Sequence, residues 1–462
     1  MQALFLMIIG IYALAAVFFA IKNDWSTIVF FLAAVLLQNL IAIVFCAYVP
    51  SMYISLFSLV KEVMLYLAVI VAFVRKGRVN LSCRSNQLML VLLAVYCVML
   101  VKNLLSTSVG LYAAIVSLRY LLLPLLCIYV GMNLTISPRR LDTLLKTIVG
   151  FSCLLAVTAL IEYFFLGDEF WSSIGYTYYA EAIKGNGGWT LVNGVTVNFY
   201  TWDFGPMIRR LVGITADPLA TAYLIFLGAA IVVTGCVRER STGKINKFWF
   251  CALLCGICAL AVFSKAIYVL VLVLPVMIAY FNKWFPRWFM KAAIVVGGVA
   301  AAGVLMLYLR HSETVTSAIV HITGLLKGFA AMGLTGHGLG TAGVQAAMLA
   351  GETVAAAESF VGSMAVQVGL LGVGAFAAYL LVLFVRLIRI WNRYHSRFTL
   401  FALALLPGLV LCMMFSESSV SVMGTGIYFI LMGLAARDDV YGTCPVAVPG
   451  KLMEERLYED RN

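Results

Sequence analysis

The chain has 462 residues, of which 63% are hydrophobic and only 11% are charged, and its mean hydropathy is +1.03. A water-soluble protein cannot hide that much apolar surface, so a large soluble domain is excluded. The formal net charge of +12 lies mainly in connections between apolar runs, which argues against a nucleic-acid partner and for contact with anionic membrane lipids.

Runs of roughly 17–25 apolar residues are long enough to cross a bilayer as helices. The sequence therefore predicts an all-α, polytopic integral membrane protein with about 12–13 transmembrane helices. These form a single domain over residues 1–436, and a polar cytoplasmic tail follows at 437–462. The predicted spans are 3–21, 27–48, 53–74, 87–101, 109–131, 147–166, 211–235, 248–263, 266–282, 292–309, 362–385, 399–415 and 420–436.

Most of the 32 Lys and Arg residues fall in alternate connections, such as "RKGRVNLSCRSN" and "RLIRIWNRYHSR". An excess of positive charge marks the cytoplasmic connections of a membrane protein. The pattern predicts an inner-membrane type of protein with its N-terminus outside and its C-terminus in the cytoplasm. Two long connections, about 167–208 and about 310–361, are then extracytoplasmic, and we expect function to face outward.

Three cysteines, Cys251, Cys255 and Cys258, have a spacing that resembles a metal site. They lie in an apolar run without a partner cluster of ligands, so we interpret them as small hydrophobic residues. The sequence predicts no metal site and no cofactor.

Two adjacent arginines, Arg209 and Arg210, directly precede an apolar run on the predicted outer side. Arginines there can extend their charged ends to the membrane interface. Two adjacent arginines on the outer side, however, are unusual, because positive charge is normally concentrated on the cytoplasmic side. The pair also stands near a predicted helix N-terminus, where N–H groups favour anions. The pair therefore predicts a phosphate or pyrophosphate clamp. Asp217, before Pro218, is either the N-cap of this helix or a carboxylate held near the arginines.

Further charged residues lie inside predicted spans. Arg119 in "SLRYLLLP" stands in the outer half of its span, and Lys61, Glu62 and Glu162 belong to the same class. Ionisable groups inside the bilayer indicate a functional site, and the alternative is a buried structural ion pair. Lys265 in "FSKA" lies in a predicted tight outer hairpin and is either a substrate-binding cation or an interfacial anchor.

The two outer connections carry the other candidates. The second contains the glycine-rich "GLTGHGLGTAG", which lacks the lysine of a nucleotide-binding loop. His337, Glu352 and Glu358 are its candidate acid or base groups, or else solvated loop residues. The first is dense in aromatic residues, including Trp189 and Trp202. Such rings belong to the interfacial belt or stack against sugars.

The order of these pieces resembles the O-antigen polymerase and ligase superfamily of bacterial membrane proteins. The motifs that carry the resemblance lie between about residues 110 and 436 and read "LRYLLLP", "RRLVGITADP", "FSKA", "GHGLGTAG" and "ESFVGSMAVQVGLLGVG". Two positions depart from the family pattern. Lys265 replaces the arginine of a Ser-Arg pair, and Glu358 stands near where the ligases carry a histidine. The second departure favours the repeat-unit polymerase branch.

The resemblance implies a GT-C-like fold and a metal-independent glycosyltransferase of the bacterial cytoplasmic membrane. The implied reaction joins oligosaccharide repeat units, carried on undecaprenyl pyrophosphate, into a cell-surface polysaccharide. The implied partners are this lipid-linked oligosaccharide and the flippase and chain-length regulator of the same pathway. The expected catalytic residues are Arg210, Arg119, Asp217, His337 and Glu358. The expected substrate-binding residues are Arg209, Lys265, Arg310, Glu352, Trp189 and Trp202.

Three alternatives stay open at this stage. A ligase of the same superfamily would transfer finished glycan to another acceptor. A transporter of lipid-linked sugars would also use charges inside the membrane, but it is expected to show repeated halves, and none are apparent. A non-catalytic channel or scaffold would leave the outer cations without a role.

Overall fold

The computed structural model describes residues 1–76, 84–106, 110–182, 191–202, 207–237, 247–286, 288, 316–343 and 358–441. Within these ranges the chain is almost entirely helical, which confirms the all-α prediction. The predicted span 292–309, most of the second long connection and the end of the tail lie outside the described residues. So do three of the expected site residues, Trp189, Arg310 and Glu352.

Each predicted span other than 292–309 corresponds to a helix. These helices are α1 (Gln2–Lys22), α2 (Trp25–Cys46), α3 (Ser51–Lys76), α4 (Arg84–Ser106), α5 (Leu111–Asn133), α6 (Pro138–Ile161), α9 (Pro218–Val233), α10 (Phe248–Ala261), α11 (Lys265–Phe281), α15 (Phe360–Tyr394), α16 (Arg397–Phe415) and α17 (Gly426–Ala435). Among the described helices, seven are long and apolar enough to cross a membrane, and five further apolar helices are shorter. The chain is thus a multi-pass membrane protein.

Side-chain caps explain several helix starts. Asp24, Ser137, Asp217 and Ser396 each accept a hydrogen bond from a backbone N–H in the first turn of the following helix. The span predicted to begin at residue 211 begins as α9 only at Pro218. The preceding residues form a short 3₁₀ turn, η3 (Gly213–Thr215), so Asp217 is the first residue that can cap the helix.

The centre of the bundle depends on two glycines. Helices α5 and α17 pack together, and a Cβ added at Gly131 would lie 2.0 Å from the carbonyl oxygen of Ile430. A Cβ added at Gly433 would lie 2.0 Å from the carbonyl oxygen of Ile128. The two backbones therefore touch directly, which is a close approach that small residues allow in membrane helices.

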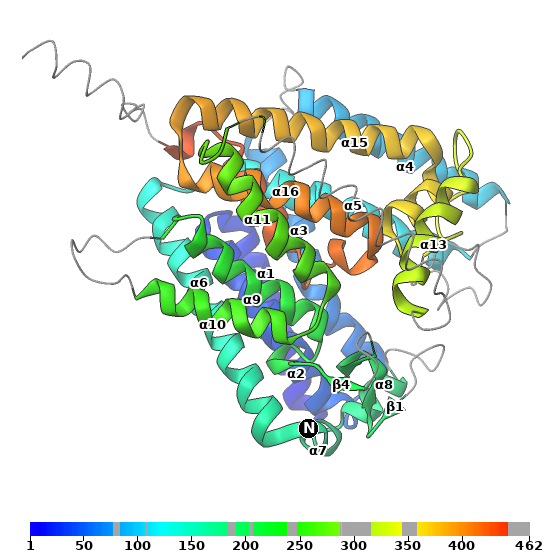
Figure 1. Cartoon of the computed structure of the whole chain (residues 1–462). Helices are drawn as coiled ribbons and strands as arrows, with labels where there is room; N and C mark the ends of the chain where they lie inside the picture. The colour runs from blue at the N-terminus through cyan, green and yellow to red at the C-terminus, as the bar shows by residue number, and fades with distance from the viewer. Residues whose placement is uncertain are drawn as a thin grey trace, which may run out of the picture.

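Other helices are arranged around this pair. Helix α9 is buried along most of its length and packs against α6 and α10, and α11 packs against α16. Figure 1 shows α15 and α4 running side by side along one side of the bundle, with α13 (Thr316–Ala330) near one end of α15. Helices α1 and α10 expose many large apolar side chains, which are the surfaces expected to contact lipid.

The first long connection folds into a small cap. It contains the helices α7 (Gly167–Ser173) and α8 (Tyr176–Ala182) and a 3₁₀ turn, η2 (Val197–Phe199), and a π-helical turn, η1 (Glu162–Leu166), joins it to α6. Two antiparallel hairpins pair β1 (Leu191–Val192) with β2 (Val195–Thr196) and β3 (Tyr200–Thr201) with β4 (Ile208–Arg209). Its core is continuous with residues near the ends of α1, α2 and α3. We call this the capped end of the bundle (Figure 1).

Most aromatic residues in the described part of the cap are buried and do not present a sugar-binding surface. Trp171, Tyr176, Phe199 and Tyr200 are buried in the core of the cap, because it gains stability by removing large rings from water. Trp202 is 47% exposed. Basic residues gather at the opposite end of the bundle and include Lys22, Arg75, Arg139, Arg140, Arg393 and Arg437.

Two of the family-like motifs contact each other. Helix α15 is kinked at Gly369, where φ is 66° and ψ is −167°, and the glycine-rich turn 333–343 fits against this kink. The backbone N–H of His337 donates to the carbonyl of Val366 at 2.8 Å, and that of Gly338 donates to the carbonyl of Gln367 at 3.0 Å. The kink therefore frees backbone groups that hold the turn in place.

Replacing Gly369 by alanine is expected to displace this turn. The new Cβ would lie 2.3 Å from the backbone nitrogen of Gly336, and a backbone conformation that essentially only glycine adopts costs another residue about 1–3 kcal/mol. Gly374→Ala on the same helix is the matched control, because a Cβ there meets nothing within 4 Å. Amide hydrogen exchange of the turn should accelerate in the first variant only. Equal exchange in both variants would contradict this role of the kink.

Candidate functional site

A cavity of about 390 Å³ lies between the helices near the capped end. Its walls come from α2, α3, α5, α8, the N-cap of α9 and the segment before α17, so residues far apart in sequence meet there. The lining residues are Gln38, Asn39, Ser55, Ser58, Leu59, Lys61, Glu62, Tyr112, Arg119, Tyr120, Leu123, Tyr179, Asp217, Val420, Ser421, Val422 and Met423.

Four charged side chains line this cavity. The Nε of Arg119 lies 3.3 Å from the Oε2 of Glu62, whose side chain is 8% exposed. Lys61 is 5% exposed, and its Nζ donates to the carbonyl of Ser58 at 2.8 Å. Asp217 completes the set. The structure thus brings Arg119 and Asp217, two expected catalytic residues, into one cavity together with the intramembrane pair Lys61 and Glu62.

The cavity reaches deep into the helical layer. At 1.5 Å per residue, Arg119 stands about 12 Å from the N-terminus of α5 and Lys61 about 15 Å from the N-terminus of α3. Charges at such a depth are expensive unless they have partners or contact water or a ligand. A polar cavity between α3 and α5 supplies that environment.

Asp217 agrees with both roles that the sequence left open, a helix N-cap and a carboxylate near an arginine. Its Oδ1 accepts hydrogen bonds from the backbone N–H groups of Leu219 at 2.9 Å and Ala220 at 3.2 Å, so it is the N-cap of α9. It also lines the cavity that contains Arg119. Since Asp217 already satisfies these N–H groups, the N-terminus of α9 is not the open anion site that the sequence predicted.

Two polar residues of α2 belong to the site and were not identified from the sequence. The Nδ2 of Asn39 donates to the carbonyl of Thr215 at 2.8 Å, which ties α2 to the turn before α9. Gln38 is 3% exposed, and its Oε1 has no hydrogen-bond partner within the described part of the chain. A buried acceptor facing a cavity is expected to bind water or a ligand. The sequence feature that could have identified them is a pair of adjacent amide side chains inside an apolar run, "LLQNLI".

Arg209 lies outside the cavity, in an ion-pair network of the cap. Its Nε lies 2.7 Å from the Oδ1 of Asp168, and its Nη groups pair with Glu162. Glu162 also accepts a hydrogen bond from the indole of Trp171 at 2.7 Å. Burial alone would lower the pKa of Arg209, but the bonds and charge of the two carboxylates raise it. Arg209 therefore stabilises the cap and does not form an anion clamp with Arg210.

Replacing Arg209 by methionine is expected to destabilise the cap by about 3–5 kcal/mol, because it leaves two largely buried carboxylates without their partner. Hydrogen exchange should lose protection in α7 and α8. Arg389→Met, at an exposed position on α15, is the control. The double variant Arg209→Met/Glu162→Gln should recover part of the loss. A cap that stays fully protected in Arg209→Met would contradict this assignment.

Three other predicted cations and aromatics do not line the cavity. Arg210 is half-buried, and its backbone N–H donates to the carbonyl of Phe199 at 2.8 Å. Lys265 is the first residue of α11, after a short connection from α10 that confirms the predicted tight hairpin. Trp202 follows β3 at the surface of the cap. The cationic part of the cavity thus consists of Arg119 and Lys61.

The candidate acid and base groups of the second connection also lie elsewhere. His337 is exposed, and its Nε2 lies 2.9 Å from the carbonyl oxygen of Ala331. Glu358 stands just before α15, where its Oε2 lies 3.0 Å from the Nδ1 of His321 on α13. Neither side chain lines the larger cavity.

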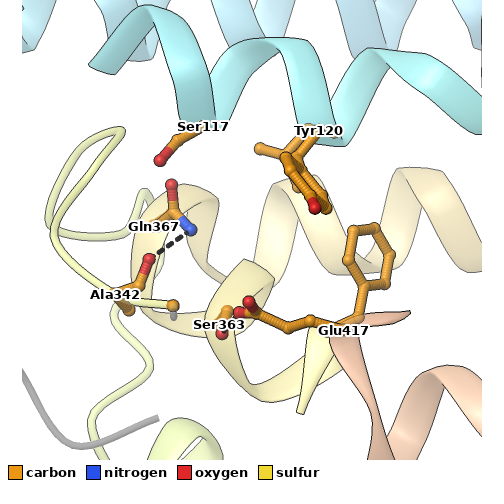
Figure 2. A pocket seen from close by; sticks show the side chains of 9 residues that line it. Ser117, Tyr120, Ala342, Ser363, Gln367 and Glu417 are labelled. Atoms are coloured by element: carbon orange, nitrogen blue, oxygen red, sulfur yellow. Dashed lines mark hydrogen bonds between the residues drawn. The ribbon is translucent and has the colours of Figure 1, made fainter. Parts of the chain in front are cut away.

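A second, small cavity of about 20 Å³ adjoins the first. Tyr120 lines both, and the remaining walls are Ser117, Leu121, Ala342, Gly343, Phe360, Ser363, Gln367 and Glu417. Figure 2 shows Ser117 and Tyr120 on α5 facing Ser363, Gln367 and Glu417. Glu417 lies in the 3₁₀ turn η4 (Glu417–Val420) between α16 and α17. It was missed in the sequence, where its only signal was an acidic residue in a short connection between two spans.

No group of three or more potential metal ligands occurs among the described residues. The Sγ atoms of Cys153 and Cys255 lie 3.7 Å apart in the contact between α6 and α10. Cys255 and Cys258 are buried, so both pack as small apolar residues, as the sequence predicted.

A comparison with known proteins gives no match to any protein-family model and none to a curated protein sequence. The resemblance to the O-antigen polymerase and ligase superfamily therefore stays a prediction from short motifs.

Proposed function

We propose that the protein joins oligosaccharide repeat units, carried on undecaprenyl pyrophosphate, into a polysaccharide at the outer face of the bacterial cytoplasmic membrane. The observation that carries this proposal is the larger cavity, in which Arg119 and Lys61 lie deep between α3 and α5. The capped end of the bundle is then the outer end. The basic residues at the opposite end agree with that orientation.

The charges of the cavity suit a lipid diphosphate. Arg119 lines the cavity and pairs with Glu62 through its Nε at 3.3 Å, so its guanidinium is held at the cavity wall where a ligand could bind it. A guanidinium binds phosphate through two parallel hydrogen bonds, and the ammonium of Lys61 adds a second positive charge. The ion pair with Glu62 holds Arg119 in position.

The neutral part of the lining suits a sugar. Gln38, Ser55 and Ser58 supply amide and hydroxyl groups, and Tyr112 and Tyr179 supply aromatic rings with polar tips. Sugar rings combine hydroxyl groups with apolar C–H faces, so a wall of this mixed type matches them. At about 390 Å³, the cavity has room for one or a few sugar rings with a phosphate.

The chemistry follows from these groups. The hydroxyl of the acceptor attacks the anomeric carbon of the donor, and the bond from that carbon to the pyrophosphate oxygen breaks. The leaving pyrophosphate carries away the electron pair, so Arg119 and Lys61 stabilise the charge that develops in the transition state. Direct displacement inverts the anomeric centre. This account needs no metal ion, because cationic side chains neutralise the leaving group.

The polymerase is favoured over the ligase by the sequence, in which Glu358 stands near the position of the ligase histidine. Deleting the gene and examining the surface glycan on a gel tests the proposal. We expect single repeat units without a ladder of longer chains. A ladder retained on the carrier lipid would instead identify a ligase, and units trapped in the cytoplasm would identify a transporter. Either result would overturn the proposal.

A further inference from the structure

The small cavity contains a carboxylate that none of the preceding chemistry uses. The Oε1 of Glu417 accepts a hydrogen bond from the hydroxyl of Ser363 at 2.6 Å, and a Cβ added at Gly343 would lie 2.6 Å from the same oxygen. The backbone N–H of Glu417 donates to the carbonyl of Glu358 at 3.0 Å. The turn between α16 and α17, the kinked helix α15 and the end of the glycine-rich turn thus hold this carboxylate in one place (Figure 2).

The two cavities share a wall, so Glu417 lies beside the proposed site of chemistry. Tyr120 lines both of them, and Ser117 and Leu121 of the same helix line the small one. The turn that contains Glu417 continues into Val420 and Ser421, which line the larger cavity. Tyr120 thus stands between the cavity that contains Arg119 and Lys61 and the one that contains Glu417.

The size of the small cavity limits what enters it. A space of about 20 Å³ admits one water molecule or one hydroxyl group but excludes a sugar ring. Hydroxyl and amide groups of Ser117, Ser363 and Gln367 surround it. The Nε2 of Gln367 donates to the carbonyl of Ala342 at 2.9 Å, and its Oε1 accepts from the N–H of Gly340 at 2.9 Å. The wall is thus fixed on the side of the glycine-rich turn.

We propose that Glu417 is the general base of glycosyl transfer, receiving the proton of one acceptor hydroxyl that enters the small cavity. This inference rests on the proposed polymerase function and adds its missing proton acceptor. As the acceptor oxygen forms its bond to the anomeric carbon, its proton passes to the carboxylate of Glu417. The pyrophosphate leaves on the opposite side with the electron pair, held by Arg119 and Lys61. Glu417 then loses the proton to water.

Glu417 fits this role better than the candidates named from the sequence. Asp217 already accepts two backbone hydrogen bonds as a helix cap. His337 is exposed and bound to its own turn, and Glu358 pairs with His321. Glu417 alone among these lines the small cavity that adjoins Arg119 across Tyr120.

The test uses the full-length protein in lipid nanodiscs with a lipid-linked repeat unit as substrate. Glu417→Gln keeps the size of the side chain and its bond to Ser363, so it should fold and bind undecaprenyl pyrophosphate with unchanged affinity. Chain elongation should fall by about 100-fold or more, in line with the loss of a general base. Glu417→Asp should retain part of the rate. Asp142→Asn, at an exposed carboxylate on α6, is the control and should elongate normally.

A pH profile separates catalysis from a structural role. The wild-type rate should fall on the acid side as the base becomes protonated, and the residual rate of Glu417→Gln should lack that limb. The other titratable groups packed around this site, His321, Glu358 and Tyr120, are present in both proteins. If the wild type elongates and Glu417→Gln elongates equally well with the same profile, the inference fails. If the wild type does not elongate at all, the proposed function fails instead.

Discussion

Replacing Arg119 by glutamine is expected to lower the rate of chain elongation by about two to three orders of magnitude, which is the usual effect of removing one group that stabilises transition-state charge. Arg119 is the guanidinium that lines the larger cavity, where the proposal places the pyrophosphate. Binding of undecaprenyl pyrophosphate should weaken in parallel. Both quantities are measured with purified protein in nanodiscs.

The control for this experiment addresses stability. Arg119→Gln leaves Glu62 buried without its partner, and this can destabilise the protein. The double variant Glu62→Gln/Arg119→Gln removes both charges, so it should fold normally and still be inactive. Arg119→Lys keeps a charge but loses the paired donors and should show an intermediate rate. A double variant with a wild-type rate would show that the cavity is not the site of transfer.

Replacing Gly433 by alanine is expected to disrupt the packing at the centre of the bundle. The added Cβ would lie 2.0 Å from the carbonyl oxygen of Ile128, where backbone rather than a flexible side chain blocks it. Helices α5 and α17 would have to separate, and overpacking of this kind costs roughly 1–3 kcal/mol or more. The midpoint of thermal unfolding in detergent should fall accordingly.

This variant also tests how the fold positions the site. Helix α5 carries Arg119 and Tyr120, and the segment before α17 carries the residues that close the cavity. Gly433→Ala should therefore lower elongation even in the fraction that stays folded. Gly256→Ala on α10 is the matched control, because a Cβ there meets nothing within 4 Å. If both variants unfold at the wild-type midpoint, the close contact of α5 with α17 is not required.

Hydropathy predicted the helices well, because a run of apolar residues long enough for a bilayer is a local property of the sequence. Helix starts were less accurate. The span expected from residue 211 begins at Pro218, since the turn before it places Asp217 at the cap. Charged residues inside spans, such as Lys61, Glu62 and Arg119, could also be identified from the sequence, because each interrupts an apolar run.

What each charged residue contacts could not be predicted, because it depends on how distant helices pack. Arg209 and Arg119 looked alike in sequence, yet one is bound by Glu162 and Asp168 within the cap and the other lines a cavity. Glu417 stood in a short connection without a motif. Its place beside Tyr120 follows from the packing of α5, α15 and the turn before α17.

The contact between the glycine-rich turn and the kink at Gly369 also could not be predicted from the sequence. Both "GHGLG" and "VGLLG" were recognised as parts of family-like motifs. That one motif fits against the other required the structure. The contact matters for the site because the end of this turn, at Ala342 and Gly343, forms a wall of the small cavity.

The most direct measurement combines the purified protein, reconstituted in nanodiscs, with a synthetic repeat unit on undecaprenyl pyrophosphate. We expect a ladder of longer glycans, with one molecule of undecaprenyl pyrophosphate released for each new linkage. The Glu62→Gln/Arg119→Gln variant should release none. A folded wild-type protein that binds the lipid but neither forms the ladder nor releases the carrier would contradict the claim that this cavity holds a lipid diphosphate for sugar transfer.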